Sequence, residues 1–166
     1  MRAGSLLAVS LPVTAAAVFV VSTSRSLPSV VASHFGPGGT ANGFMPHAFY
    51  VRFMVAFVVL LPLLLNLVAG AVARLPGKLV NIPNRQYWLA PERREQAVDV
   101  LRGRMQLFAA MLATFLCYVH WLVVSANQSV PPMLDDRKFV AGMAVFMFLL
   151  VVWIVALRRK FRAPEP

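Results

Sequence analysis

The sequence predicts an all-α membrane protein of four transmembrane helices, with both termini on the cytoplasmic side. Of the 166 residues, 59% are hydrophobic and 13% are charged, whereas a soluble domain averages roughly 45–50% apolar and about 25% charged residues. Four long apolar runs divide the chain. Basic residues collect in alternate connections between these runs, an arrangement typical of multi-pass membrane proteins.

The first apolar run, Leu6 to Ser22, contains no charged residue, and Pro12 predicts a kink within it. The run could also be a signal peptide that is removed, because Arg2 gives it a positive start and its length is suitable. However, Ser22-Thr23-Ser24 fits the small-residue cleavage pattern poorly. We therefore expect a retained transmembrane helix.

Three further runs have the length of a membrane span. They are Phe53 to Ala73, Met105 to Val124 and Phe139 to Leu157. About 20 residues rising about 1.5 Å each cross a hydrocarbon core of about 30 Å. Only a helix satisfies its own backbone hydrogen bonds in such a core, so each run predicts a transmembrane helix, and Pro62 is tolerated inside the second span.

Polar side chains are scarce inside the spans, and none of them is Asp or Glu. Ion pumps and ion-coupled transporters place ionisable groups at that depth, so the sequence argues against both. Asn66 is expected to join two helices by a hydrogen bond. The small-residue pairs Ala69/Ala73 and Ala109/Ala113 predict faces where helices approach closely.

The distribution of basic residues predicts the orientation of the spans. Twelve Lys and Arg residues lie on one side and four on the other, and the richer side is expected to be cytoplasmic. The net charge of +10 is therefore interpreted as a topology signal with an attraction to anionic lipid headgroups, and not as a nucleic-acid surface. The four outer residues are Arg25, Arg52, Arg137 and Lys138.

Residues 76–104 are expected to form a cytoplasmic loop followed by an amphipathic helix. Tyr87 and Trp88, beside basic residues, predict anchors at the membrane interface. Pro91 followed by Glu92 predicts a helix start. Apolar residues at helical spacing indicate that this helix continues into the third span: Val98, Leu101, Met105 and Phe108.

A glycine-rich segment, Ser33 to Phe44 (SHFGPGGTANGF), joins the first two spans. Its residues 36–41 fit G-x-G-x-x-A, the pattern of a dinucleotide-binding turn. That turn requires a strand before it and a helix N-terminus after it in a βαβ unit, whereas this segment lies between two membrane spans. Pro37 also lacks the backbone N–H that a phosphate would need. We therefore expect a compact turn on the outer face, and no nucleotide.

The stretch from Leu27 to Phe44 resembles the signature of a bacterial family of membrane domains (domain of unknown function 1648), which includes the N-terminal part of the SdpI immunity protein. The resemblance covers roughly residues 5–75 and departs from the family pattern at Ala41 and Asn42, where proline and aspartate are usual. It implies a membrane protein without catalytic activity. The matching residues are Leu27, Pro28, Val31, His34, Phe35, Gly39, Asn42, Gly43 and Phe44.

The three histidines all fall on the predicted outer side, and His47 and His120 are the candidate ligands for a metal ion or a bis-histidine haem. No helix carries histidines at metal-ligand spacing. Tyr118, His120 and Trp121 also fit an aromatic belt in which the histidine makes a hydrogen bond. We therefore expect no metal and no cofactor, with haem or metal binding as an alternative. No catalytic motif is visible, so we expect no enzyme.

The sequence is thus expected to comprise three parts: a helical hairpin (1–75) with an outer loop (23–52), the cytoplasmic segment (76–104), and a second helix pair with a basic tail (105–166). The predicted location is the bacterial cytoplasmic (inner) membrane. The predicted partners are the lipid bilayer and other membrane proteins, with no nucleic acid. The expected function is that of an accessory or interaction subunit. The alternative is immunity to, or sensing of, a membrane-active peptide.

Overall fold

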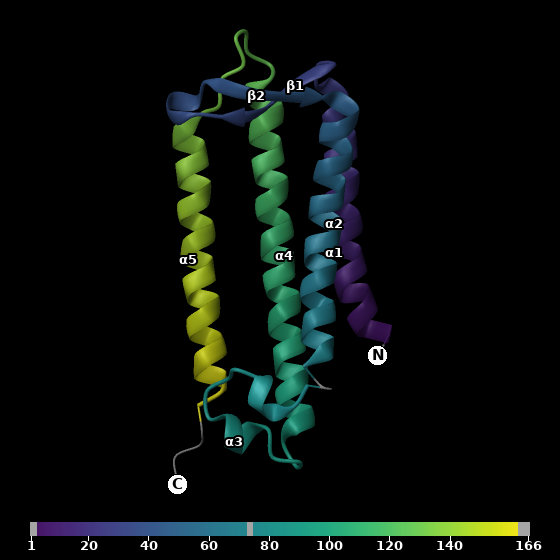
Figure 1. The fold of residues 1–166 in the computed structure, drawn as a ribbon, viewed down its shortest axis with the longest axis vertical. Coiled ribbons are helices and arrows are strands. Elements are labelled where there is room, and N and C mark those ends of the chain that lie inside the picture. The colour runs from purple at the N-terminus through teal and green to yellow at the C-terminus, as the bar shows by residue number, and fades with distance from the viewer. Residues whose placement is uncertain (1–2, 73–74, 163–166) are drawn as a thin grey trace.

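The computed structural model describes residues 3–72 and 75–162 as a bundle of long helices with a β-hairpin across one end (Figure 1). The long helices are α1 (Ala3–Thr23), α2 (His47–Ala71), α4 (Arg94–Ala126) and α5 (Asp136–Lys160), and a short α3 (Arg85–Trp88) lies at the other end. The hairpin consists of β1 (Val30–Phe35) and β2 (Ala41–Pro46). Single 3-10 turns occupy Ser24–Ser26, Pro37–Gly39 and Gly77–Leu79.

Three of the helices, α2, α4 and α5, are long and apolar enough to cross a membrane. The 33 residues of α4 extend about 50 Å at about 1.5 Å per residue, more than a bilayer core of about 30 Å requires. The predicted amphipathic segment therefore does continue into the third apolar run as one helix, although that helix begins at Arg94 and not at Pro91. A fourth span through α1 and the sides on which the termini lie stay predictions.

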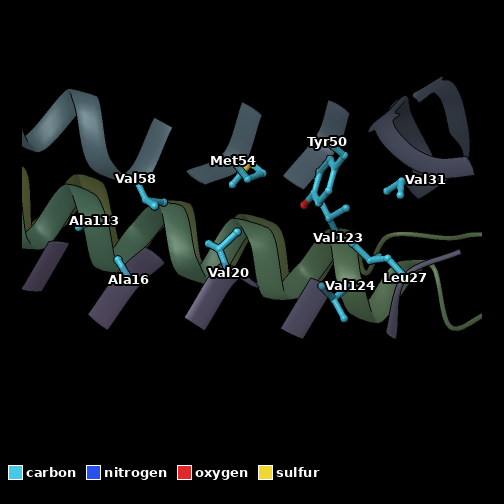
Figure 2. Packing of buried hydrophobic residues seen from close by; sticks show 10 residues of the cluster. All are labelled: Ala16, Val20, Leu27, Val31, Tyr50, Met54, Val58, Ala113, Val123 and Val124. Carbon is cyan, nitrogen blue, oxygen red and sulfur yellow. The ribbon is translucent and has the colours of Figure 1, made fainter. Parts of the chain in front are cut away.

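The core lies where α1, α2 and α4 meet. Figure 2 shows its side chains converging from these three helices, with Val31 of β1 closing one end. Ala109 and Ala113 on α4 are both buried, and so is Ala69 on α2, as the predicted small-residue faces require. Ala73 lies outside the described residues. Close backbone approach through such small residues is a common means of helix association in membranes.

The fourth long helix, α5, packs along the opposite side of α4. Phe115 and Phe146 stack with their rings 4.4 Å apart, and the indole of Trp153 donates a hydrogen bond to the Arg104 carbonyl at 2.8 Å. None of the residues of α5, all of which the structure describes, is buried. One broad apolar face of α5 is therefore available to lipid or to another protein.

Asn66 is expected to join two helices, but among the described residues its side chain bonds only within its own helix, where its amide donates to the Pro62 carbonyl at 2.7 Å. It lies beside a narrow cavity of about 10 Å³ that Pro12 and Pro62 line from neighbouring helices. Proline cannot donate its own backbone hydrogen bond. The Asn66 amide therefore adds a hydrogen bond to α2 beside Pro62, where the helix lacks one backbone hydrogen bond.

The connection between α1 and α2 is a two-stranded antiparallel hairpin, a difference from the all-α prediction. Val31 pairs with Met45 and Ala32 with Phe44, and the register is interrupted at His34. A two-stranded hairpin is marginal by itself in water, so this one depends on tertiary contacts. We call this end of the molecule, with the 127–135 loop, the hairpin end, and the opposite end, with α3 and the C-terminus of α5, the basic end (Figure 1).

Candidate functional site

A buried histidine joins three helices at the hairpin end. His120 on α4 is completely buried. Its Nε2 lies 2.8 Å from the Thr23 hydroxyl at the end of α1, and its Nδ1 lies 2.8 Å from the Tyr50 hydroxyl on α2. The Tyr50 ring also stacks on the imidazole, with the ring centroids 5.7 Å apart. One side chain thus fixes the relative positions of α1, α2 and α4.

The hydrogen bonds of Thr23 favour one direction for this network. The Thr23 hydroxyl donates its proton to the Phe19 carbonyl at 2.7 Å, so its oxygen accepts from the Nε2–H of His120. The Nδ1 of a neutral imidazole is then an acceptor, and the Tyr50 hydroxyl donates to it. Every polar atom of the imidazole is thereby satisfied, as buried polar groups require.

A second histidine ties the start of α2 to the segment after α1. The His47 Nε2 donates to the Ser24 carbonyl at 2.9 Å, and the His47 backbone N–H donates to the Ser29 carbonyl at 2.9 Å. Ser24 follows Thr23 directly, so His47 and His120 contact consecutive residues. The Ser24 hydroxyl is buried and finds no hydrogen-bond partner among the described residues.

The arrangement of His47 and His120 bears on the metal and haem alternative. A metal ion or haem would have to replace the hydrogen bonds that occupy both nitrogens of His120 and the Nε2 of His47. Within residues 3–72 and 75–162, no group of three or more His, Cys, Asp or Glu side chains is placed to hold a metal ion. Both histidines therefore act as structural hydrogen-bonding groups in this structure.

Asn127, at the C-terminal end of α4, holds the hairpin on the bundle. Its side-chain oxygen accepts from the Ala32 backbone N–H at 2.8 Å, and its amide donates to the Ala32 carbonyl at 2.9 Å. The same amide also donates to the Val123 carbonyl at 2.8 Å. The sequence does not predict this role for Asn127, because an asparagine after an apolar run is common and carries no signal of a distant partner.

Gly39 holds the turn of the hairpin against the 127–135 loop. Its carbonyl accepts from the Leu134 backbone N–H at 2.8 Å, and Thr40 pairs with Met133 in an isolated antiparallel bridge. Its φ of +76° lies in the left-handed region, and a side chain here would collide with the Leu134 carbonyl. Glycine is therefore the residue that fits at this position.

The structure brings most of the family-like motif together on the hairpin. The ring of His34 is hydrogen-bonded through Nδ1 to the Asn42 side-chain oxygen, and Gly43 lies so close to His34 that an added Cβ would stand 2.8 Å from the Cβ of His34. Leu27 lies apart from them in the buried core. Pro28 is exposed, and Phe35 is half-buried.

The side of the hairpin that points away from the helices is exposed and largely apolar. Val31 and Ala32 are buried, whereas Phe44 is 57% and Val30 is 58% exposed. We define the outward face of the hairpin as the exposed residues of its two strands: Val30, His34, Asn42, Phe44 and Pro46.

The helix that follows the 127–135 loop is capped by Asp135. Its carboxylate accepts a hydrogen bond from the Lys138 backbone N–H at 3.1 Å and pairs with the Lys138 ammonium at 3.2 Å. The backbone hydrogen bond lowers the pKa of the Asp135 carboxyl below its usual range. The charged form therefore stabilises the start of α5.

No protein-family model matches the chain, and no curated protein and no solved structure matches it significantly. The resemblance of residues 27–44 to the family of membrane domains therefore stays a prediction based on the motif.

Proposed function

We propose that this chain is a four-span protein of the bacterial cytoplasmic membrane, without catalytic activity, that serves as an interaction or accessory subunit of a membrane complex. The proposal places α1 in the membrane as the fourth span, both termini in the cytoplasm and the hairpin on the outer face. The contact surface is the outward face of the hairpin.

The observation that supports this proposal is the contrast between the fixed backbone of the hairpin and its exposed side chains. Asn127, His47 and Leu134 tie the hairpin and the residues that flank it to the rest of the molecule. Phe44 nevertheless remains exposed on top of it. A preordered surface loses less conformational entropy on binding, and aromatic side chains are enriched at protein interfaces.

The broad apolar face of α5 is compatible with the same function. This helix packs chiefly against α4 and exposes large apolar side chains along its length, including Val140, Phe148 and Val155. Lipid covers such a face in an isolated protein. In a complex, the same face can pack against helices of another subunit.

Co-purification tests the proposed function directly. The tagged full-length protein, extracted from its native membrane in mild detergent, is expected to bring a membrane protein with it in stoichiometric amount. Phe44→Ala should reduce that yield severalfold. Phe57→Ala is the matched control, because it removes an aromatic side chain that is also exposed but lies on α2, away from the hairpin and from the apolar face of α5. Absence of a stoichiometric partner with the wild-type protein would contradict the proposal.

The immunity alternative is also supported by the hairpin, because an external peptide would reach this surface first. In that case, deletion of the protein should sensitise cells to a membrane-active peptide. His34→Ala should reproduce the effect, since His34 is exposed and held by Asn42. Normal resistance of the deletion strain to such peptides would exclude this alternative.

The haem alternative has its own readout. Bis-histidine ligation predicts a Soret band in the purified protein that disappears in His120→Ala. The hydrogen bonds of His120 lead us to expect a colourless protein. A haem-containing wild-type protein would contradict that expectation.

A further inference from the structure

At the basic end, the loop between α2 and α4 is folded against the end of α5. The side-chain amide of Asn84 and the indole N–H of Trp88 both donate to the Phe161 carbonyl, at 2.9 Å and 3.0 Å. Phe161 itself is completely buried, and its ring makes a T-shaped contact with the Trp88 ring. Two segments far apart in the sequence therefore form one layer across the ends of the helices (Figure 1).

This folding concentrates positive charge. In the part of the chain that the structure describes, the basic end carries ten basic and three acidic side chains, and the hairpin end carries four basic and two acidic ones. Lys78 and Arg85 on the loop are exposed, as are three consecutive basic residues at the end of α5. The ten basic residues are Lys78, Arg85, Arg93, Arg94, Arg102, Arg104, Arg158, Arg159, Lys160 and Arg162.

Beside these charges, the loop forms an open hollow of about 500 Å³. None of its seven lining residues, all within the described part of the chain, is acidic. Asn81, Gln86 and Arg85 supply N–H donors, and Val80, Ile82 and Tyr87 supply apolar surface. A lining of this kind can contact both the charged and the carbon-rich parts of one ligand.

We infer that this hollow binds the headgroup of an anionic phospholipid, with its phosphodiester held by Arg85. The charge of the site is complementary to such a headgroup. The loop that lines the hollow lies at the end of the molecule where α2 and α5, two helices long and apolar enough to span a membrane, come to an end. A phospholipid presents its headgroup where such helices end. The inference does not depend on which side of the membrane the basic end occupies.

The geometry of Arg85 fits this role. Its Nη1 donates to the Lys78 carbonyl at 3.2 Å, which restrains the position of the guanidinium. A guanidinium has five N–H donors in a planar fork, so donors remain for a phosphate. Lys78, whose carbonyl accepts this hydrogen bond, brings a second positive charge to the same loop.

Native mass spectrometry of the purified full-length protein can test the inference by titration with phosphatidylglycerol or phosphatidylcholine. We expect phosphatidylglycerol to bind about tenfold more tightly, and Arg85→Gln to bring the affinities for the two lipids to within about twofold of each other. Arg52→Gln is the matched control, because Arg52 is also exposed and donates to a backbone carbonyl, that of Ala48, at the other end of the molecule. It should leave the preference unchanged.

Two outcomes would overturn the inference. One is equal binding of the two lipids. The other is an equal loss of preference in Arg85→Gln and Arg52→Gln, which would indicate diffuse attraction to net charge. An excess of inorganic phosphate should not displace the lipid. Displacement would assign the hollow to free phosphate and contradict the lipid assignment.

Discussion

The two ends of the bundle are built by different kinds of interaction. At the hairpin end, buried hydrogen bonds link α1, α2, α4 and the strands, and the central imidazole of His120 is fully enclosed. At the basic end, the long loop is joined to α5 mainly through a single carbonyl, that of Phe161, amid exposed charges. The hairpin end is therefore held in a defined geometry by buried hydrogen bonds, whereas the main feature of the basic end is its exposed positive charge.

This difference predicts how each end responds to substitution. A buried hydrogen-bonding group that loses its partner lowers the free energy of unfolding by about 1–3 kcal/mol, because it cannot form a replacement hydrogen bond with water. Exposed ion pairs typically contribute about 1 kcal/mol or less. Substitutions at the hairpin end should therefore change stability, and substitutions of the exposed charges at the basic end should mainly change binding to anionic lipid.

The largest effect is expected from His120→Ala. The substitution leaves a cavity and removes the partner of both the Tyr50 hydroxyl and Thr23, so we expect a loss of about 2–5 kcal/mol, measured by thermal unfolding in detergent. Thr114→Ala on the same helix is the control, because the Thr114 hydroxyl is exposed and bonds only to its own helix at Ala110. Equal melting temperatures for the two variants would contradict the claim that buried hydrogen bonds of His120 stabilise the hairpin end.

The next effect is expected from Asn127→Ala, which removes the hydrogen bonds to both backbone groups of Ala32. We expect a loss of about 1–3 kcal/mol. The loss should be local, with the Ala32 amide exchanging its hydrogen much faster than in the wild type. Gln128→Ala, at an exposed neighbouring position, should leave that exchange unchanged. Unaltered protection in Asn127→Ala would show that the hairpin is held by other contacts.

The contact between the hairpin turn and the 127–135 loop can be tested with two glycines. Cysteines introduced at Thr40 and Met133, which form a β-bridge, should cross-link readily. Gly39→Ala should reduce cross-linking, because the new side chain collides with the Leu134 carbonyl. Gly38→Ala has a similar φ, +79°, but nothing within 4 Å of the added Cβ, so it should cost only about 1 kcal/mol of backbone strain and preserve the cross-link. Equal cross-linking in both would contradict this packing.

A smaller effect is expected at the basic end from Trp88→Phe. The change keeps an aromatic ring but removes the N–H that donates to Phe161, whose carbonyl retains the bond from Asn84. We therefore expect a loss of about 0.5–1.5 kcal/mol in thermal unfolding. A loss as large as that of His120→Ala would mean that the two ends are equally dependent on hydrogen bonds.

The smallest effect concerns pH at Asp135. Its carboxyl pKa is lowered in the folded protein, so the stabilisation by its charged form is present at neutral pH. That stabilisation is lost as the pH falls from the ordinary aspartate range to the lower folded value. The Lys138 amide resonance should titrate with a midpoint below about 3.9, and the titration should vanish in Asp135→Asn. A midpoint above that value would contradict the capping geometry.

The long helices could be predicted from the sequence, because the length and the apolar composition of each run are sufficient to indicate a helix that can cross a membrane. The hairpin strands could not, since Ala41–Pro46 contains glycine and proline, and the partner strand is held by a distant group, the side chain of Asn127 bonded to Ala32. His120 stands out in the sequence as a polar residue in an apolar run, and its neighbours Tyr118 and Trp121 predict a hydrogen bond for it. Its partners, Thr23 and Tyr50, are 97 and 70 residues away, beyond the reach of any local pattern.

Trp88 shows the same limit at the basic end. An aromatic residue beside basic ones predicted an anchor at the membrane interface. That anchor stays a prediction. The structure adds that the indole N–H donates to the Phe161 carbonyl, 73 residues away in the sequence. Local composition indicates the environment of such a residue but cannot identify the backbone group to which it donates.

Site-directed labelling of single cysteines tests the central claim, that the hairpin end faces outward and the basic end faces the cytoplasm. In a Cys117→Ser background, Thr40→Cys and Arg85→Cys each place one thiol at an exposed position, one at each end. We expect a membrane-impermeant maleimide added to intact cells to label position 40 and to label position 85 only after the membrane is opened. Labelling of position 85, but not of position 40, in intact cells would contradict the account.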